Sequence, residues 1–353
     1  MSDTPNRNDP AGPEHSTDPG LSADPKPRPG RRKRRGWRVA AVAATSVLAL
    51  VAVVAVGTYA LVNHVASSIP RVRVGHLEAA TRTGAGSHSR GETVLITGSS
   101  FGPTGTSAPV PSPPEFSGLI MLLHINPNHK AGGVVSIPPQ AMVFVPGVGK
   151  TQLWFAAEHG GPNLLVDAVE RLTHVPIRHF ARLSLNGLGE VVATVGGVTV
   201  RLPETTTSFG HTFNAGTNEL NGLTSIYYAR QPSLSEDGRV LRQQSLIRAI
   251  LQKISREDLL TSPARTFHVV HAISRALTVD SDFTTSQIVS LTKALGGLTS
   301  RSSTFVTAPA HMVGGQELLR TKICGRLWAA INQNSIASFA KRYPWTVTPD
   351  EVP

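Results

Sequence analysis

Three arginines and a glutamine are the residues of this chain whose types and spacing best fit a chemical role. Arg239, Arg242 and Gln243 lie three and four positions apart, so they share one face of a helix. Arg239 is also close to the start of the predicted helix, where free amide groups and the helix dipole favour anions. Arginine holds phosphate oxygens through a fork of N–H donors. If Arg230 converges on the same point, the group would suit a diphosphate; spacing alone leaves a solvated basic face equally open.

Three other candidates for chemistry are weaker. Residues 98–102 match the Gly-x-Ser-x-Gly pattern of a serine nucleophile, but that pattern requires a helix next, and Pro103 opens a proline-rich loop instead. His268 and His271 lie three apart on a predicted helix without a third ligand at a recognisable spacing, so a surface or core pair is favoured over a metal site. The single cysteine, Cys324, excludes an intramolecular disulfide and is expected to be buried.

These residues need a scaffold, and the sequence predicts one in which strands and helices intermix, an α/β or α+β class. The apolar runs on either side of residues 126–128, Asn-Pro-Asn, predict a hairpin. His124 lies in the first run and is expected to be a hydrogen-bonded core histidine. Pro162 is well placed at the first position of a helix. The predicted strands are residues 93–97, 119–125, 133–137, 198–202 and 304–307; the predicted helices begin at 162 and at 237 or 238, and span 263–276, 284–295 and 317–331.

The N-terminal part of the chain predicts a membrane anchor. Residues 1–36 are rich in Pro, Asp, Ser and Asn and end in a cluster of arginines, so we expect a disordered basic tail. The 25 residues 39–63 carry no charge. As a helix they would be roughly 37 Å long, enough to cross a bilayer. The adjacent basic cluster places the N-terminus in the cytoplasm and the rest of the chain outside it. A cleaved signal peptide is the alternative, but its apolar stretch is usually only about 7–15 residues long.

The charge and the predicted anchor restrict the classes of partner and predict how the chain is divided. The net charge of +11 favours anionic partners. Because the main domain is expected outside the cytoplasm, nucleic acid is disfavoured, which leaves phosphate groups and the membrane face. The expected parts are a tail (1–36), a single transmembrane anchor (37–63), a linker (64–90), an extracytoplasmic domain (91–300) and a C-terminal strand and helix that complete it (301–353).

Several short motifs, in order, resemble one known family. They are residues 119–127 (Leu-Ile-Met-Leu-Leu-His-Ile-Asn-Pro), 134–138 (Val-Val-Ser-Ile-Pro), 160–162 (Gly-Gly-Pro), 195–198 (Val-Gly-Gly-Val), 228–230 (Tyr-Ala-Arg), 238–244 (Gly-Arg-Val-Leu-Arg-Gln-Gln) and 305–309 (Phe-Val-Thr-Ala-Pro). Their order and spacing resemble the LytR-CpsA-Psr (LCP) family, and the predicted N-terminal anchor fits it too.

The resemblance implies an α/β fold with a mixed central sheet between helices, preceded by one transmembrane helix. Members transfer a glycan phosphate from a polyprenyl-pyrophosphate carrier to a peptidoglycan hydroxyl, with Mg²⁺ as cofactor and the lipid tail in an apolar channel. Actinobacterial members attach arabinogalactan, and the Ala-, Arg- and Gly-rich composition fits such a source. The family's pyrophosphate ligands that remain here are Arg230, Arg239, Arg242 and Gln243.

The metal half of the family's site does not carry over. Ser100 and Gly118 stand at the two aspartate positions and supply no negative charge, so we assign no metal ligand and expect no bound metal. Losing one electrostatic group of this kind costs roughly 10²–10³ in rate. The replaced segments are 98–102 (Gly-Ser-Ser-Phe-Gly), 116–119 (Phe-Ser-Gly-Leu), 137–140 (Ile-Pro-Pro-Gln) and Pro232, two residues after Arg230.

The retained arginines beside a missing metal site leave three hypotheses open. The first is a degenerate member with lost or weakened phosphotransferase activity, which binds a polyprenyl-phosphate lipid or a wall glycopolymer and assists an active paralogue. The second is a working Mg²⁺-dependent transferase with relocated metal ligands, for which Glu115 and Glu92 are the candidates. The third is a structural envelope protein without a ligand. Separately, the resemblance implies that Glu236 or Asp237 replaces the acidic residue that the family has just ahead of Arg239.

Overall fold

The computed structural model describes residues 69–75, 77, 91–99, 116–128, 131–257, 262–284, 286–288, 291 and 303–353. The predicted tail and anchor, and most of the predicted linker, lie outside these residues. Within the described ranges, no helix is both long and apolar enough to cross a membrane.

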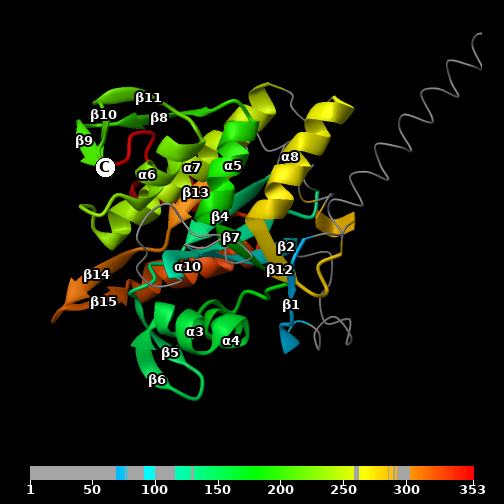
Figure 1. The fold of residues 1–353 in the computed structure, drawn as a ribbon. Coiled ribbons are helices and arrows are strands. Elements are labelled where there is room, and N and C mark those ends of the chain that lie inside the picture. Colours follow the sequence, from blue (N-terminus) through cyan, green and yellow to red (C-terminus); the bar gives the residue numbers. More distant parts are fainter. Residues whose placement is uncertain are drawn as a thin grey trace, which may run out of the picture. The chain divides into compact units, whose positions relative to one another are not determined.

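A mixed sheet of seven strands forms the centre of the described part (Figure 1). The pairs β1/β12, β7/β2 and β4/β13 are parallel, and the other neighbours are antiparallel. Strands β7, β2, β4 and β13 therefore all end at one edge of the sheet, which we call the carboxyl edge. In spatial order the strands are β1 (Arg71–Val72), β12 (Leu277–Asp280), β7 (His179–Ser184), β2 (Glu92–Ser99), β3 (Phe116–Ile125), β4 (Gly132–Ser136) and β13 (Ser303–Thr307).

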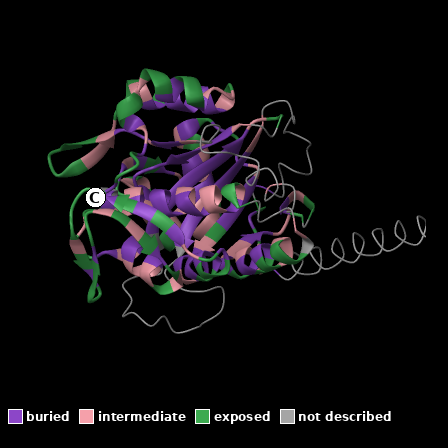
Figure 2. Ribbon diagram, turned by 90° about the horizontal axis from the view of Figure 1, so that it is seen from above, coloured by how far each residue is buried: buried purple, intermediate pink, exposed green. Residues whose placement is uncertain are grey.

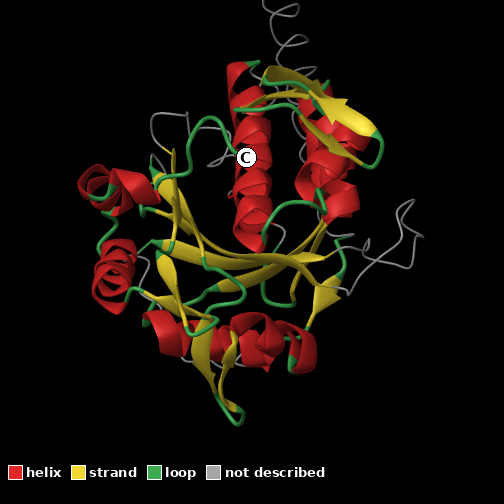
Figure 3. Ribbon diagram, turned by 90° about the vertical axis from the view of Figure 1, so that its left-hand side faces the viewer, coloured by secondary structure: helices red, strands yellow, loops and turns green. Residues whose placement is uncertain are grey.

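Helices cover both faces of this sheet (Figure 3). Apolar side chains alternate between the two faces along β2 and β3, as a sheet buried on both sides requires: Leu95 and Leu122 pack into one core, and Val94 and Met121 into the other. Burial is concentrated in the sheet and on the helix faces turned toward it (Figure 2). One face carries α5 (Leu185–Thr194), α7 (Glu236–Arg256) and α8 (Pro263–Ala276); the other carries α3 (Leu153–His159), α4 (Gly161–Thr173), α10 (Thr321–Asn332) and α11 (Ile336–Arg342).

Smaller elements surround this centre. Helix α6 (Gly222–Arg230) precedes α7, and its first turn is held by a capping box between Asn221 and Thr224. A short 3₁₀ helix, η2 (Pro344–Thr346), follows α11. The described part also contains four two-stranded antiparallel sheets, of which β8 and β11 are connected through β9 and β10. The pairs are β5 (Met142–Val145) with β6 (Gly149–Gln152), β8 (Val198–Leu202) with β11 (Gly216–Leu220), β9 (Thr206–Ser208) with β10 (His211–Phe213), and β14 (Ala310–Val313) with β15 (Gln316–Leu319).

The predicted α/β class with a mixed sheet between helices is confirmed, and so is the hairpin of β3 with β4. The predicted helix over 317–331 is wrong at its start. Gly314 and Gly315 have φ of 57° and 79°, which turns the chain into the β14–β15 hairpin before α10 begins at Thr321. Most of the predicted helix 284–295 lies outside the described residues.

Candidate functional site

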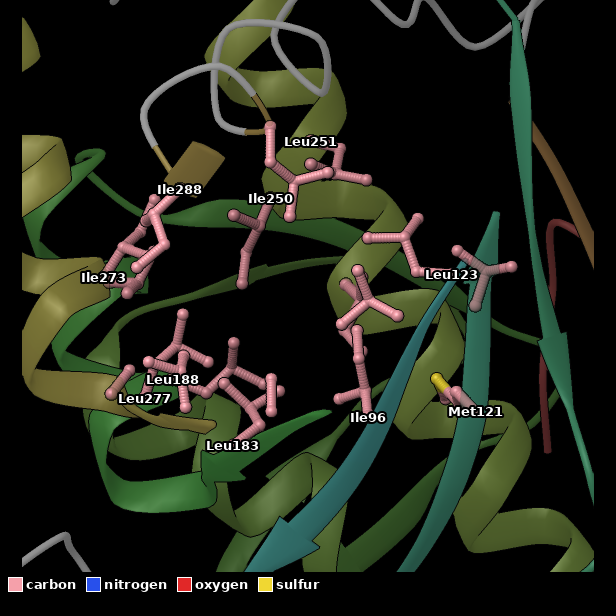
Figure 4. A pocket seen from close by; sticks show the side chains of 18 of the residues that line it. Ile96, Met121, Leu123, Leu183, Leu188, Ile250, Leu251, Ile273, Leu277 and Ile288 are labelled. Atoms are coloured by element: carbon pink, nitrogen blue, oxygen red, sulfur yellow. The ribbon is translucent and has the colours of Figure 1, made fainter. Parts of the chain in front are cut away.

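An apolar cavity of about 170 Å³ lies between the sheet and the helices α5, α7 and α8 (Figure 4). Every residue that lines it is apolar, so the cavity has no polar partner to offer water and suits a hydrocarbon. Its lining side chains include Ile96 and Met121 from the sheet, Leu183 and Leu188 around the start of α5, Ile250 and Leu251 on α7, and Ile273 on α8.

One stripe of α7 joins this cavity to two of the sequence-predicted residues. Ile247, Ile250 and Ile254 line the cavity at the i, i+3 and i+7 positions of one helix face. The same stripe continues toward the start of the helix through Gln243 and Arg239, each four residues before the next. At 1.5 Å per residue, Arg239 lies roughly 12 Å along the helix axis from Ile247. A chain lying in the cavity could thus carry a polar group at Gln243 and Arg239.

The start of α7 lies at the carboxyl edge of the sheet. The side-chain amide of Gln244 donates hydrogen bonds to Ser136, at the end of β4, and at 3.2 Å to Thr307, at the end of β13. In open α/β sheets, ligands bind outside the carboxyl ends of the strands. The arginine-bearing end of α7 therefore occupies the edge at which a ligand is expected.

Local contacts hold Arg239 in the first turn of α7. Ser235 caps the helix, and its hydroxyl accepts a hydrogen bond from the backbone N–H of Gly238 at 3.2 Å. The half-buried Arg239 side chain donates to the carbonyl of Leu234 at 2.8 Å. The guanidinium is thus fixed beside the helix N-terminus, where the dipole favours an anion.

Arg242 lies outside the stripe and faces inward. Its side chain is only 1% exposed, and its guanidinium donates to the carbonyls of Pro353 and Tyr228 and to the side-chain oxygen of Gln231. Burial lowers the pKa of Arg242, and the Coulombic interaction with Tyr228 partly offsets this effect. Arg242 was predicted from the sequence as an anion ligand. In the structure its N–H groups instead donate to protein oxygens, so Arg242 positions the elements that form the site.

Arg230 and Gln243 lie near this point on neighbouring helices. Arg230 is the last residue of α6 and is half-buried, and burial lowers the pKa of its guanidinium. Gln231 follows it and accepts the bond from Arg242, so the end of α6 is held against the first turns of α7. Gln243 is 2% exposed. The structure thus brings all four predicted residues to the junction of α6 and α7, with Arg230 and Arg239 as its half-exposed cations.

Sequence reasoning missed Arg248 and the C-terminal segment, residues 347–353. The Arg248 guanidinium donates to the carbonyl of Thr348 at 3.0 Å and lies 3.4 Å from the Asp350 carboxylate. Val352 is fully buried, and the guanidinium of Arg201 donates twice to the Glu351 carboxylate, at 2.9 and 3.0 Å. No local pattern marks this segment, because its place depends on the side chains of Arg248 and Arg201, whose contacts with it span 100 and 150 residues of the chain.

Among the residues that the structure describes, no group of three His, Cys, Asp or Glu side chains could hold a metal ion. Gly118 is buried in β3 with a φ of 76°, next to a shift in the register between β2 and β3. Residues other than glycine rarely adopt a positive φ. The backbone conformation of Gly118 therefore disfavours an aspartate at this position. Ser100 and Glu115 lie outside the described residues.

Glu92, one of the two relocated ligands considered from the sequence, is on the wrong side of the sheet. It begins β2, whereas Ser99 ends that strand at the carboxyl edge. Seven residues of strand separate the two by roughly 23 Å. Glu92 instead lies 3.5 Å from His179, which also pairs with Asp280 at 3.2 Å. Glu92 is therefore wrong as a relocated metal ligand at the carboxyl edge.

The three histidines and the cysteine singled out from the sequence lie in surroundings typical of core or surface residues. His124 is buried, with Thr93 and Asn334 each 2.9 Å from one ring nitrogen, as expected for a core histidine. His268 and His271 are exposed on α8. Cys324 is buried and free, as predicted, and burial raises the pKa of its thiol to about 11.

By their names, known proteins with similar sequences act in cell-wall assembly. The transferase TagU of Enterococcus faecalis, named for polyisoprenyl-teichoic acid and peptidoglycan, is 31% identical over 163 residues, which are 45% of this chain and 53% of TagU. The probable cell wall biosynthesis protein LcpB of Corynebacterium glutamicum is 33% identical over 155 residues, which are 43% of this chain and 37% of LcpB. The matched part of the chain thus spans about half, or less, of the length of these relatives.

Solved structures share the fold. Protein gbs0355 of Streptococcus agalactiae superimposes with a TM-score of 0.58 at 19% identity, over 70% of this chain and 90% of its own. The LytR-Csp2A-Psr enzyme of Actinomyces oris has a TM-score of 0.56 at 18% identity, over 69% and 90%. The model of the LytR_cpsA_psr family matches residues 77–334, well over half of the sequence. The chain belongs to the LytR-CpsA-Psr family.

Proposed function

We propose that this protein binds a polyprenyl-phosphate or polyprenyl-pyrophosphate lipid that carries a cell-wall glycopolymer. The observation that carries the proposal is the single stripe of α7 that runs from the apolar cavity at Ile254 to Gln243 and Arg239. An amphipathic ligand would lay its hydrocarbon in the cavity and its phosphate against the two half-exposed arginines, Arg230 and Arg239. The related TagU is named a polyisoprenyl-teichoic acid–peptidoglycan teichoic acid transferase, and this name supports the ligand class.

The size of the cavity defines which part of the lipid it would take. A dry cavity of about 150 Å³ admits a molecule the size of benzene. The present volume of about 170 Å³ therefore suits roughly one five-carbon unit next to the phosphate. Longer chains would have to widen the space between α7 and α8 or leave it for the surrounding lipid.

We further propose that phosphotransferase activity is lost or weakened in this chain. Phosphoryl transfer depends on cations that neutralise the transferring group. The arginines supply part of that charge, whereas Gly118 supplies no metal ligand. The expected role is to present or retain the lipid-linked polymer for an active paralogue, from a single-pass anchor at residues 37–63 with the domain outside the cytoplasm.

Binding tests this proposal directly. Native mass spectrometry of the full chain with a short polyprenyl pyrophosphate, with and without Mg²⁺, should show an adduct of unchanged lipid mass in both conditions. Arg239→Gln should weaken the adduct about tenfold or more, because it removes a charge-assisted phosphate contact. Arg275→Gln is the matched control, since Arg275 is 61% exposed on α8 and pairs with Glu190.

Three results would contradict the proposal or parts of it. Equal lipid affinity in wild type and Arg239→Gln would remove the arginine site. A product lighter by one phosphate, formed only with Mg²⁺, would support an active transferase with metal ligands among residues that the structure does not describe. Absence of any lipid adduct would favour the purely structural role.

A further inference from the structure

A short segment after β12 closes one side of the apolar cavity. It consists of residues 283, 284 and 286–288, which we call the cover segment. Phe283 and Ile288 of this segment are buried, and both line the cavity. Figure 4 shows Ile288 beside Ile273 of α8 in the wall of the cavity. The cover segment therefore supplies part of the surface that a bound hydrocarbon touches, and it must move if this side of the cavity is to open.

A buried histidine of the sheet contacts this segment twice. His179 begins β7. The Phe283 ring stacks on its imidazole, with the ring centroids 4.0 Å apart and the planes at 9°. The side-chain nitrogen of Gln287 lies 3.1 Å from the Nε2 atom of His179. The imidazole thus joins the cover segment to the sheet.

The surrounding hydrogen bonds assign the neutral form of this imidazole. The Oε1 atom of Gln287 accepts from the backbone N–H of Thr284 at 2.9 Å and from its hydroxyl at 2.6 Å. The NH₂ group of Gln287 therefore faces His179, and because that group can only donate, Nε2 must accept and carries no proton. The proton is then on Nδ1, which lies 3.2 Å from the Asp280 carboxylate.

The Asp280 carboxylate is a fixed partner of His179. It lies on β12, is buried, and accepts from the backbone N–H groups of Phe180 and Asp282 at 2.9 and 3.0 Å. These bonds satisfy the carboxylate while it is ionised, so it can keep the Nδ1–H of His179 in either charge state of the ring.

Two further charged side chains reach this point from neighbouring strands. The Glu92 carboxylate, from β2, lies 3.5 Å from Nε2 of His179, the same nitrogen that Gln287 contacts. The Arg71 guanidinium, from β1, donates to the carbonyl of Phe283 at 2.7 Å and to two carbonyls just before it. Glu92 is therefore the acidic acceptor that Nε2 meets when it gains a proton.

Protonation exchanges the partner of Nε2. An imidazolium donates from both nitrogens, so its Nε2–H faces the NH₂ group of Gln287, which offers it no lone pair. The Glu92 carboxylate is an acceptor for that same proton, and the bond from Nδ1 to Asp280 is kept. A proton taken up from solvent thus breaks the link to the cover segment and strengthens the links within the sheet.

From this geometry we propose that His179 is a proton-operated latch on the apolar cavity. The neutral imidazole holds Gln287 and keeps the cover segment closed, whereas the imidazolium pairs with Glu92 and releases it. Histidine is the side chain that ordinarily changes its charge between pH 5 and 8, which defines the range to be tested. The latch rests on the proposed function only for the identity of the lipid that enters the cavity.

Hydrogen–deuterium exchange of the full chain tests the latch without any lipid. Exchange of the cover-segment amides is compared at about pH 7.5 and about pH 5.5, and each rate is divided by the intrinsic rate at that pH. We expect the protection of wild type to fall about tenfold at the lower pH, the size expected for one lost hydrogen bond. Equal protection at the two pH values would overturn the latch.

Two substitutions of Gln287 should have different effects. Gln287→Ala removes the latch, so its protection should be low and equal at both pH values. Gln287→Glu offers a carboxylate to Nε2, so its protection should be higher at the lower pH, the reverse of wild type. His268→Gln is the control, because His268 is exposed on α8 and this variant should keep the wild-type pH dependence. Wild-type behaviour of Gln287→Ala or Gln287→Glu would overturn the latch.

Release of a short fluorescent polyprenyl phosphate from the full chain separates the latch from the proposed function. Wild type should release the lipid about tenfold faster at the lower pH, and Gln287→Ala should release it fast at both. The phosphate titrates identically in both experiments, so the difference between the two proteins isolates the latch. A lipid that binds but leaves both proteins at equal rates would overturn the latch and leave the lipid proposal standing. A pH-dependent protection without any lipid binding would sustain the latch and contradict the proposed function.

Discussion

The guanidinium carbon of Arg242 lies 4.7 Å from the centroid of the Tyr228 ring, and the two side chains are 1% and 0% exposed. A cation this enclosed persists only because its donors are matched by the carbonyls of Tyr228 and Pro353 and by Gln231. The contact joins α6, α7 and the C-terminal segment. Arg242 therefore determines where Arg230 and Arg239 lie, while it is itself withdrawn from solvent.

Substitutions of Arg239 and Arg242 should have different effects on stability and on lipid binding. Arg242→Gln leaves buried carbonyls without donors, so we expect it to lower the free energy of unfolding by about 2–4 kcal/mol. Arg239→Gln, at a half-exposed position, should change it by less than about 1 kcal/mol while weakening lipid binding. Urea unfolding and lipid titration of both variants measure the contrast. If Arg242→Gln is as stable as wild type and loses only the ligand, Arg242 is a direct ligand after all.

Filling the apolar cavity should block the lipid without harming the fold. Ala181 lies on β7 and lines the cavity, so Ala181→Leu has free volume to occupy and should change stability by less than about 1 kcal/mol. Ala168→Leu is the matched control, because Ala168 is fully buried in the core on the other face of the sheet, away from the cavity. Overpacking there should cost about 1–3 kcal/mol.

Lipid affinity then decides what the cavity does. Ala181→Leu should weaken binding of a polyprenyl phosphate but not of inorganic pyrophosphate, because only the tail is excluded. A variant that is stable and binds the polyprenyl lipid like wild type would show that the tail lies elsewhere.

The sequence predicted most of the elements that position this site, and the reasons are local. The alternation of apolar residues in β3 and β4 and the Asn-Pro-Asn turn between them specify a hairpin at short range. Periodicity also placed Arg239, Arg242 and Gln243 on neighbouring positions of α7. It could not show which of them faces the core, because that depends on Tyr228 and on Pro353, 111 residues away from Arg242. The β14–β15 hairpin was missed because Glu317 and the leucines after it are good helix formers, and the Gly-Gly turn overrides that preference.

His124 should make stability depend on mildly acidic pH. Burial lowers its pKa below the ordinary value of 6.5, and Thr93 and Asn334 engage both ring nitrogens of the imidazole. The unfolded chain takes up a proton near pH 6.5 while the folded imidazole stays neutral, so the stability contribution is present above that pH and is lost as pH falls below it.

Urea unfolding at pH 7, 6 and 5 measures this dependence. The stability difference between wild type and His124→Gln should shrink as the pH falls. His268→Gln, at an exposed position on α8, should show no such trend. A constant difference between wild type and His124→Gln would contradict the lowered pKa.

Cys324 should make the folding stability depend on pH at the alkaline end of the range. The thiol is 2% exposed and donates to the carbonyl of Pro309 at 3.4 Å, and burial raises its pKa from 9.0 to about 11. Because the unfolded thiol loses its proton first, the contribution is fully present below pH 9 and is lost as pH rises toward 11. Wild type should therefore lose more stability than Cys324→Ala between pH 8.5 and 10.5, a range set by the same two pKa values.

Iodoacetamide at pH 8 should alkylate the native Cys324 thiol far more slowly than the urea-unfolded one, since the reactive thiolate is both rare and enclosed in the fold. Equal alkylation rates in the native and unfolded chains would show that the pocket around Cys324 opens readily, and the raised pKa would then not describe the protein in solution.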